Sequence, residues 1–429
     1  MKKLSLILAI VFFSFGLNAQ NKSGKLKVID TDTIIEKTRQ RGYFQKAYVD
    51  PGDPRFMMTN TNNTFQFGIG GIIHATSFFD FDGATMNKDF VTWHIPVPTA
   101  NTTHFGLDMG GTRLIAKGVT KTKSHEIVAV LELNVFTGSN AVNIRNAYVS
   151  YAGFTVGRTY SFFTDLDAGP LTVDNQGPNT QISNRHPLVG YRGGIGKKIY
   201  WGAAVENPDL KMSNYDSIII IDFQRVPDIA AFAQFHWKRG HVQLSQLFRC
   251  LSYLSLNTGA PVLNSYSYSD YEKNFVFGYG TALSGKVYMT KKFFFTYQLV
   301  LGRGISSYIQ ELAEAKLDLV TCMGSKEMKP LTTYGGYLAF QYEFTPTVTA
   351  SMTFGSVAIN RYNDENYYDV NIDNYKSSYY LAVSAFKEIF EHGLFGIEYL
   401  WGERKNVDEF DCVAKGRSNR IDLMMKYTF

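Results

Sequence analysis

Residues 420–429 read RIDLMMKYTF, and every second side chain from Ile421 onward is apolar. The apolar set is Ile421, Leu423, Met425, Tyr427 and Phe429, and the residues between them include Arg420, Asp422 and Lys426. Successive side chains of a β-strand point to opposite faces. The stretch therefore predicts a strand with one face against an apolar environment and a charged face toward water.

The same alternation recurs along the chain, for example in EIVAVLELNV at 126–135 and TYGGYLAFQYEFTP at 333–346. Segments of this kind, about ten residues long, are typical of strands. We predict strands at residues 64–79, 104–118, 125–136, 142–151, 154–159, 186–196, 199–206, 229–238, 241–250, 274–287, 291–301, 332–343, 347–359, 377–388, 393–402 and 420–429.

The connections between these segments alternate in length. AG at 152–153, KK at 197–198 and EHG at 391–393 are short, whereas most of the others run to about 15–30 residues; TGSNA at 137–141 is an exception. Short turns on one rim and long loops on the other are typical of outer-membrane barrels. Closure leaves no unpaired backbone in lipid, and about sixteen strands enclose an aqueous channel. We therefore predict an all-β protein, a 16-stranded antiparallel transmembrane β-barrel over residues 64–429.

The N-terminal residues indicate secretion. MKKLSLILAIVFFSFGLNAQ has two lysines, an apolar run and a small residue at Ala19, which is the pattern of a signal peptide over residues 1–19. The apolar run is shorter than the roughly 20 residues of a membrane-spanning helix. Residues 20–63 are expected to form a short periplasmic segment, and the DTDTIIEKTRQRGYF stretch within it is too short for a stable isolated helix. The expected location is the bacterial outer membrane.

Composition excludes several other classes of protein. Loss of Lys2 and Lys3 with the signal peptide lowers the net charge from +5 to +3, which is too small to indicate nucleic-acid binding. Cys250, Cys322 and Cys412 have no metal-binding spacing, and one disulfide with one free thiol is an open alternative. We expect neither a metal nor a cofactor.

The loop after the fifth predicted strand differs from the other long loops. Residues 160–184, YSFFTDLDAGPLTVDNQGPNTQISN, carry Asp165, Asp167 and Asp174 and two glycine–proline pairings. In a wide barrel this loop is well placed to fold inward and narrow the lumen. The alternative is an ordinary surface loop, because long loops are often but not always functional.

Several short motifs resemble the DcaP-like family of trimeric outer-membrane porins, and the resemblance is strong over residues 65–249. The motifs are AY at Ala147 and Tyr148, GRT at Gly157–Thr159, GP at Gly177 and Pro178, Arg185 with Pro187, ENPD at Glu206–Asp209, and PD at Pro227 and Asp228.

The resemblance implies a 16-stranded homotrimeric diffusion channel with an inward loop and a preference for small anions such as dicarboxylates. It carries Arg113, Glu132, Arg145 and Arg185 over as lining positions. Gly110, Asn143 and Gly190 stand where further lining arginines would be expected, which argues against strong anion selectivity. The family's long N-terminal coiled coil is missing. The terminal aromatic residues, Tyr427 and Phe429, resemble the signal by which the barrel-assembly machinery recognises its clients.

Strand alternation predicts which charged groups line the lumen. Glu132 and Arg192 lie opposite apolar neighbours and point inward, as do Arg113 and Arg249 if Leu114 and Phe248 point outward. Arg145 is ambiguous, because neither face of IRNAYVSY is wholly apolar. We expect Asp165, Asp167 and Asp174 to face Arg113, Arg192 and Arg249 across the lumen. Any one of these arginines is otherwise a solvated charge at the rim.

The predicted function is passive diffusion of small hydrophilic solutes through a porin, with outer-membrane lipids, the barrel-assembly machinery and further copies of the chain as partners. A non-conducting, adhesin-like surface barrel is the first alternative, because the outer loops offer binding surfaces. A barrel enzyme is the second. None of the eight histidines stands in a recognisable nucleophile or metal motif.

Overall fold

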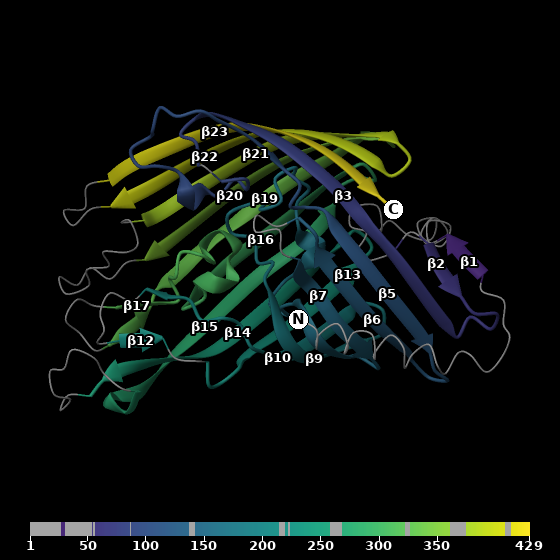
Figure 1. Ribbon diagram of the computed structural model, residues 1–429, viewed down its shortest axis with the longest axis horizontal. Coiled ribbons are helices and arrows are strands. Elements are labelled where there is room, and N and C mark those ends of the chain that lie inside the picture. Colours follow the sequence, from purple (N-terminus) through teal and green to yellow (C-terminus); the bar gives the residue numbers. More distant parts are fainter. Residues whose placement is uncertain are drawn as a thin grey trace.

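The computed structural model describes residues 27–30, 54, 56–85, 87–136, 142–213, 219–221, 224–257, 268–321, 327–360, 375–407 and 413–429. The predicted signal peptide, the DTDTIIEKTRQRGYF stretch after its first residue, Cys322 and Cys412 lie outside these ranges. The strands of the described residues join into one antiparallel sheet of 20 strands and a small sheet of three (Figure 1). In the part of the chain that the structure describes, no helix has the length and apolar character needed to cross a membrane.

The large sheet closes on itself as a 16-stranded barrel. Its strands in ring order are β3 (Phe65–Asp82), β4 (His104–Asp108) with β5 (Arg113–Lys121), β6 (Glu126–Asn134), β7 (Asn143–Tyr151), β8 (Phe154–Tyr160), β9 (Arg185–Ile195), β10 (Ile199–Glu206), β13 (Asp228–Trp237), β14 (Gly240–Leu256), β15 (Tyr271–Tyr288), β16 (Phe293–Arg303), β19 (Thr332–Thr345), β20 (Val348–Asn360), β21 (Tyr375–Phe390), β22 (Gly393–Val407) and β23 (Val413–Thr428).

The first and last strands of the ring form the closing seam. β23 pairs with β3 from Thr428 opposite Ile72 to Asn419 opposite Asp82. Phe429 completes the seam, because its backbone N–H donates to the carbonyl of Gly71 at 3.0 Å and its carbonyl accepts from the Gly71 N–H at 2.9 Å. A Cβ on Gly70 would meet the Phe429 carbonyl oxygen at 2.5 Å, so this approach of the chain end requires glycine.

The predicted strands are confirmed, with informative differences at their ends. The predicted strand 104–118 is two strands, β4 and β5, because a turn in which the Thr112 N–H bonds to the Met109 carbonyl interrupts it. β14, β22 and β23 extend beyond their predicted bounds on the long-loop side, into polar sequence such as 404–406. Apolar alternation indicates only the part of a strand that contacts an apolar medium. The backbone hydrogen bonds between strands continue beyond that part, so the strands are longer than predicted.

Smaller strands extend the sheet at both ends. β2 (Phe56–Thr59) pairs with the start of β3, and β1 (Lys27–Asp30) pairs with β2, so the N-terminal strands lie at the short-turn end of the barrel (Figure 1). At the long-loop end, β12 (Ile219–Ile221) pairs with β14. The small sheet contains β11 (Met212–Ser213), β17 (Leu319–Thr321) and β18 (Met328–Pro330).

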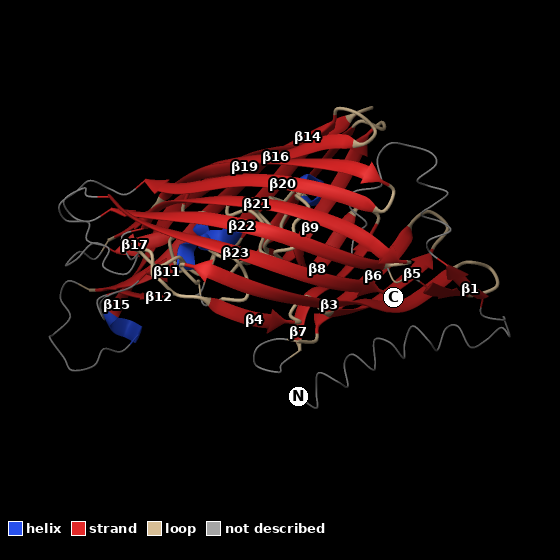
Figure 2. Cartoon of the chain, turned by 90° about the horizontal axis from the view of Figure 1, so that it is seen from above, coloured by secondary structure: helices blue, strands red, loops and turns tan. Residues whose placement is uncertain are grey.

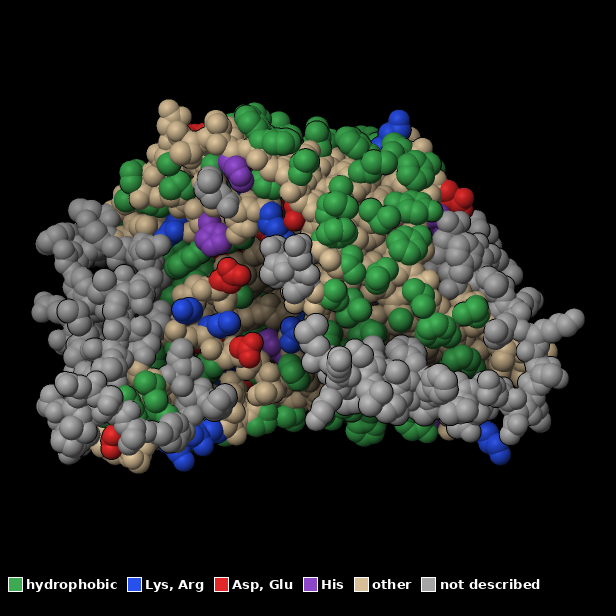
Figure 3. Space-filling view, in the orientation of Figure 1, with side chains coloured by type: hydrophobic (Ala, Val, Ile, Leu, Met, Phe, Trp, Pro, Cys, Tyr) green, Lys and Arg blue, Asp and Glu red, His purple; other side chains and the backbone are tan. Residues whose placement is uncertain are grey.

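The outer surface is apolar, as the alternation predicts. Leu423 and Met425 are 40% and 49% exposed, whereas Asp422 and Met424, which alternate with them, are enclosed. In Figure 3, hydrophobic side chains cover the surface toward the short-turn end, and a hollow edged by acidic, basic and histidine side chains lies toward the long-loop end. The expectation that Arg420 and Asp422 face water is wrong, because both are enclosed inside the barrel.

The wall of the barrel is uneven in height. β6 and β7 have nine residues each, β8 has seven and β10 has eight, whereas β14, β15 and β23 have 17, 18 and 16. A strand rises by about 3.3 Å per residue, so the wall is much lower along β6, β7, β8 and β10. We call this part of the barrel, β6–β10, the low wall.

Three loops pack inside the barrel, and we name them by their order in the chain. Loop A is residues 83–103 between β3 and β4, loop B is residues 161–184 between β8 and β9, and loop C is residues 304–318 after β16. Figure 2 shows short helical turns within the outline of the strands. Phe162, Ile182 and Tyr308 from loops B and C belong to the largest apolar core, together with inward side chains from the wall.

Candidate functional site

Loop B crosses the interior and is bonded to the wall along its length. At its start, the Phe162 N–H donates to Glu206 of β10 at 2.7 Å, and Asp165 contacts His241 of β14 at 2.9 Å and Ser284 of β15 at 2.7 Å. In its middle, the Tyr337 hydroxyl of β19 donates to the Ala168 carbonyl at 3.0 Å. Toward its end, the Asp174 N–H donates to Glu398 of β22 at 2.8 Å, and the Asn179 amide donates to Ser378 Oγ of β21 at 3.0 Å. These strands span much of the ring, so loop B lies across the lumen.

The three inner loops are also bonded to one another. Phe90 of loop A donates its N–H to Asp174 of loop B at 3.3 Å, and Trp93 of loop A donates its N–H to Glu311 of loop C at 2.6 Å. Gln310 of loop C donates its N–H to the Gln181 carbonyl of loop B at 2.9 Å. We call this set of loop-to-loop contacts the loop junction.

The predicted acids of loop B have three different environments. Asp165 is enclosed between His241 and Ser284, as described above. Asp167 is exposed, in the short helical turn Leu166–Ala168. Asp174 is enclosed, and its carboxylate accepts hydrogen bonds from the N–H groups of Phe90 and Gln176 and from the Tyr380 hydroxyl. Two of the three acids therefore anchor the loop.

Asp165, His241 and Ser284 have the residue types of a hydrolytic triad, but their order differs. A triad needs histidine between the nucleophile and the acid. Here both the serine hydroxyl and the His241 Nε2 bond to the same oxygen of Asp165, and all three side chains are enclosed. The group therefore ties loop B to β14 and β15. Among the described residues, no cluster of His, Cys, Asp and Glu has the geometry to hold a metal ion.

Arg113, Glu132 and Arg145 form a cationic cluster on the inner face of β5–β7. Glu132 Oε1 lies 3.2 Å from Arg113 Nη1 and 3.2 Å from Arg145 Nε, so two guanidinium groups share one carboxylate. A β-bulge explains the ambiguity at Arg145: Glu132 pairs with Asn146 and Leu133 pairs with Ile144, which leaves Arg145 as the extra residue. Arg145 and Asn146 therefore both reach Glu132.

Arg192 and Arg185 lie on β9 at different depths. The guanidinium carbon of Arg192 is 4.3 Å from the Phe162 ring centroid, at the start of loop B, and the residue is exposed. Arg185 is half-buried, and its guanidinium carbon is 3.9 Å from the centroid of the Tyr160 ring, whose hydroxyl it also contacts. Arg192 is thus on the same interior surface as the base of loop B.

Arg249 does not border open space. It is 1% exposed, its Nε lies 2.7 Å from Asp228, and its Nη1 lies 3.0 Å from Asp318 of loop C. The structure therefore corrects the expectation that Arg249 lines the lumen opposite the acids of loop B. The alternation correctly placed its side chain inward, but alternation along one strand does not show what covers the side chain.

Arg420 lies inside the barrel, although the alternation of residues 420–429 predicts that it faces water. Its guanidinium forms two hydrogen bonds with Asp80 at 2.6 and 3.0 Å, and others with the Asn87 and Lys88 carbonyls of loop A. Asp318 and Glu311 of loop C were not singled out at all. For Arg420, the sequence offered one indication of an interior ion pair: arginine and aspartate recur at inward positions of strands that flank long loops.

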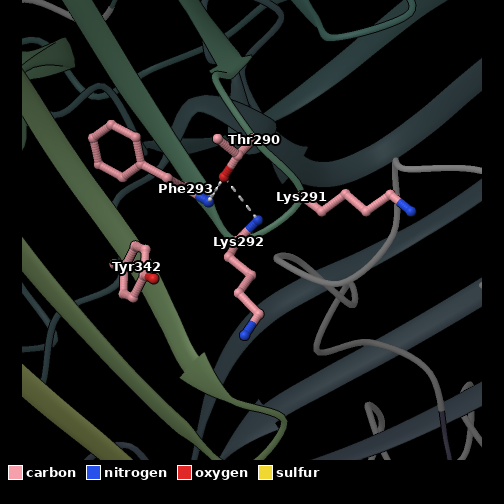
Figure 4. A pocket seen from close by; sticks show the side chains of 5 residues that line it. All are labelled: Thr290, Lys291, Lys292, Phe293 and Tyr342. Carbon is pink, nitrogen blue, oxygen red and sulfur yellow. Dashed lines mark hydrogen bonds between the residues drawn. The ribbon is translucent and has the colours of Figure 1, made fainter.

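A shallow surface hollow of about 680 Å³ lies at the short turn between β15 and β16 (Figure 4). It is lined by Thr290, Lys291, Lys292, Phe293 and Tyr342. The Thr290 hydroxyl accepts the N–H groups of Lys292 and Phe293 and so shapes the turn. Lysine with aromatic side chains is the composition expected where a barrel meets a membrane boundary.

No family model matches the chain, and no curated protein is similar to it in sequence. Among solved structures, the chain is similar to the outer membrane channel DcaP of Acinetobacter baumannii, with 18% identity, a TM-score of 0.68, and coverage of 85% of this chain and 97% of that chain. It is also similar to an anion-selective porin from Comamonas acidovorans, with 9% identity, a TM-score of 0.52, and coverage of 85% and 100%.

A third similar structure is the trimer form of OmpT, an outer membrane protein of Vibrio cholerae, with 9% identity, a TM-score of 0.52, and coverage of 85% of this chain and 100% of that chain. Identities this low show the fold alone. The resemblance predicted from the motifs over residues 65–249 is confirmed at that level, and the chain has the closed 16-stranded barrel fold of these outer-membrane channels.

Proposed function

We propose that the chain is an outer-membrane porin that admits small hydrophilic solutes by passive diffusion. The observation that supports this most is a closed barrel with an apolar outer surface and a charged, partly exposed inner face on β5–β7. The fold similarity to outer-membrane channels and porins agrees with it.

The proposed path for solutes runs between loop B and the cationic cluster. Loop B and loop C pack against β10, β14–β16 and β19–β22, whereas the Arg113 and Arg145 side chains on β5 and β7 keep 15% and 22% exposure. Two arginines against one glutamate leave a net charge of +1 on this inner face. A charge fixed in a low-dielectric channel attracts ions of opposite sign. We therefore expect a mild preference for anions.

Replacing Arg113 and Arg145 by serine should shift the channel toward cations. The change turns the net charge of the cluster from +1 to −1. Two unit charges about 8 Å from a hydrated path contribute roughly 1 kcal/mol, which chloride loses and potassium gains, so the chloride-to-potassium permeability ratio should fall by up to about thirtyfold at low salt. Reversal potentials in planar bilayers under a potassium chloride gradient measure this ratio. Lys123→Ser, at an exposed turn, removes a cation outside the lumen and should leave it unchanged.

The low wall supports assembly as a homotrimer, with further copies of the chain covering it. A membrane-crossing strand needs about 9–11 residues, and β8 has seven. Val156 and Val189 on the outer face there are 52% and 53% exposed. Arg158 shares this face with Val156, and a basic side chain facing lipid near the midplane costs about 2–4 kcal/mol. Contact with protein is therefore more favourable than contact with lipid for this surface.

Val156→Arg should convert the assembly to monomers. It places a second cation on the low wall, where the proposed copies meet. Light scattering after size exclusion in detergent, with unheated gel electrophoresis, reports the mass. Leu299→Arg adds the same charge on the exposed face of β16, which lies outside the low wall, where Leu299 is 57% exposed, and should leave the mass unchanged. A monomeric wild type, or equal effects of the two changes, would contradict the proposal.

A non-conducting surface barrel is the second candidate, and one observation favours it. Apolar side chains of loops B and C, with inward wall residues, fill part of the interior with a packed core. Single-channel recordings separate the two functions, because a folded barrel that stays silent in bilayers is not a diffusion channel.

A further inference from the structure

The loop junction contains acidic groups that lack the cationic partners expected of buried carboxylates. Glu311 of loop C is 2% exposed. Its Oε1 accepts the Trp93 N–H at 2.6 Å and the Thr92 hydroxyl, while its Oε2 has no hydrogen bond within the described residues. A carboxylate with one bare oxygen in a dry site carries a large desolvation cost unless it is protonated.

The cation that acts on Glu311 is Arg404, and its donors are engaged elsewhere. Arg404 of β22 donates to the Trp93 carbonyl and to the Asn406 side chain at 3.0 Å, and its guanidinium carbon is 4.8 Å from the Trp93 ring centroid. Tyr375 of β21 also faces Glu311, and its hydroxyl bonds to Ser378 at 2.8 Å. Burial outweighs these contacts and raises the pKa of Glu311 to about 7.

Asp174 occupies the second acidic site, at the contact of loop B with loop A. Its hydrogen bonds from the Phe90 and Gln176 N–H groups are 3.3 and 3.1 Å long, and that from Tyr380 is 3.4 Å, so none is short. The charged groups that act on it are Asp89 of loop A, Glu398 of β22 and Asp422 of β23. Lys88 and Arg420 act in turn on Asp89, and Arg420 is bonded to Asp80 of β3.

The acids around Asp174 outnumber the available cations. Glu398 and Asp422 are directly opposite each other on β22 and β23, and Asp422 Oδ1 has no hydrogen bond within the described residues. Arg420 is bonded to Asp80 and to loop A, and Lys88 is exposed and lies 3.8 Å from Asp108. Neighbouring carboxyls that share one enclosed site cannot all ionise. Burial, followed by the charges of Asp89, Glu398 and Asp422, raises the pKa of Asp174 well above its usual range.

We propose that the loop junction is a proton-controlled latch: protonated Asp174 and Glu311 hold loops A, B and C docked together, and their ionisation loosens the loops. In a channel of the proposed function, the latch would make the lumen narrower in acid than at neutral to alkaline pH. That last step rests on the proposed function, whereas the latch itself does not.

The direction in which docking depends on pH follows from proton binding. Both acids bind protons more tightly in the docked state than in the free loops, because docking raises the pKa of each. Docking is therefore fully favoured below the ordinary carboxyl range and weakens as the pH rises, through about 7 for Glu311. Between the ordinary and the raised pKa, each pH unit changes the docking equilibrium by about tenfold for each group, and above the raised pKa the equilibrium changes no further.

Hydrogen exchange of the full-length barrel in lipid vesicles tests the latch without relying on conductance. Protection of peptides within 161–184 and 304–318 is measured from pH 5.5 to 8, and each rate is corrected by the rate of the same unfolded peptide. We expect a loss of protection of about thirtyfold or more in the wild type over this range, because the pH rises by about 1.5 units before it reaches the pKa of Glu311. Wild-type protection that does not change with pH would overturn the proposal.

Two variants provide the matched test. Glu311→Gln keeps the oxygen that accepts from Trp93 and makes the protonated form permanent, as Asp174→Asn does for loop B. Both should retain protection at pH 8, and Glu126→Gln, at the exposed start of β6, should follow the wild type. A pH response that survives in the double variant would contradict the assignment to these two acids, and the wild-type profile decides the proposal if a variant fails to fold.

Bilayer recordings on the same samples separate the two proposals. Conductance that rises with pH in the wild type, but not in the double variant, supports the latch as a gate. Silent bilayers together with pH-dependent exchange would reject the channel while retaining the latch. Conductance with pH-independent exchange would do the reverse.

Discussion

Arg249→Met should destabilise the barrel by about 3–5 kcal/mol, because it leaves buried carboxylates without their cation. Arg249 is bonded to Asp228 of the wall and Asp318 of loop C, and all three side chains are completely enclosed. Methionine is apolar and has nearly the length of the removed stem, so packing losses stay small. The free energy of unfolding in lipid vesicles, measured by urea titration of tryptophan fluorescence, gives the value.

The control for this change is Arg417→Met on β23. The Arg417 side chain is 59% exposed, and its Nε lies 2.8 Å from Glu403. An exposed ion pair contributes about 0–1 kcal/mol. If both variants lose the same free energy of unfolding, then Arg249 contributes no more stability than an exposed ion pair does. Loop C should also lose protection from hydrogen exchange in Arg249→Met, since the guanidinium is one of its anchors to β14.

Arg420→Met should have a comparable effect, about 3–5 kcal/mol, at a different place in the barrel. Arg420 on β23 forms two hydrogen bonds with Asp80 on β3, so the pair crosses the closing seam. The same guanidinium bonds to the backbone of loop A and lies 4.5 Å from the Phe78 ring centroid. Urea unfolding in vesicles measures the loss, and proteolysis within residues 83–103 reports the release of loop A.

The double variant Arg420→Met with Asp80→Asn distinguishes charge from packing. If the loss in Arg420→Met comes mainly from the stranded charge of Asp80, removing that charge should restore about half or more of the stability. Additive losses in the two single variants would mean that the residues act independently, which their geometry does not predict.

The barrel was predictable from the sequence because its outer surface repeats a simple rule. Alternate residues of nearly every strand touch an apolar medium, so segments such as 332–343 and 393–402 can each be recognised as a strand from their own sequence. The bounds of β10 agree with the prediction to the residue. Where strands leave the apolar region, as at 403–407, the ladder persists without that signal and the prediction ends too early.

The interior was much less predictable. Alternation along one strand shows that Arg249 and Arg420 point inward, but their partners Asp318 and Asp80 come from elements far away in the sequence. Loop C contains no period-two pattern, so nothing in its sequence indicated that it packs inside. The bulge at Arg145 shows a further limit, because a single extra residue shifts the alternation and gives both faces a mixed composition.

The ion pair between Asp80 and Arg420 has a consequence for the order of folding. The two residues are separated by 340 positions, almost the whole length of the barrel sequence. Contacts at such separation form late, because the intervening chain must first be arranged. Loop A, which follows the first barrel strand, therefore stays undocked until the last strand arrives. A chain that stops folding before its final strand pairs would have both an unpaired sheet edge and an undocked loop A. The pairing of β23 with β3 therefore completes the barrel wall and the packing of its interior in one step.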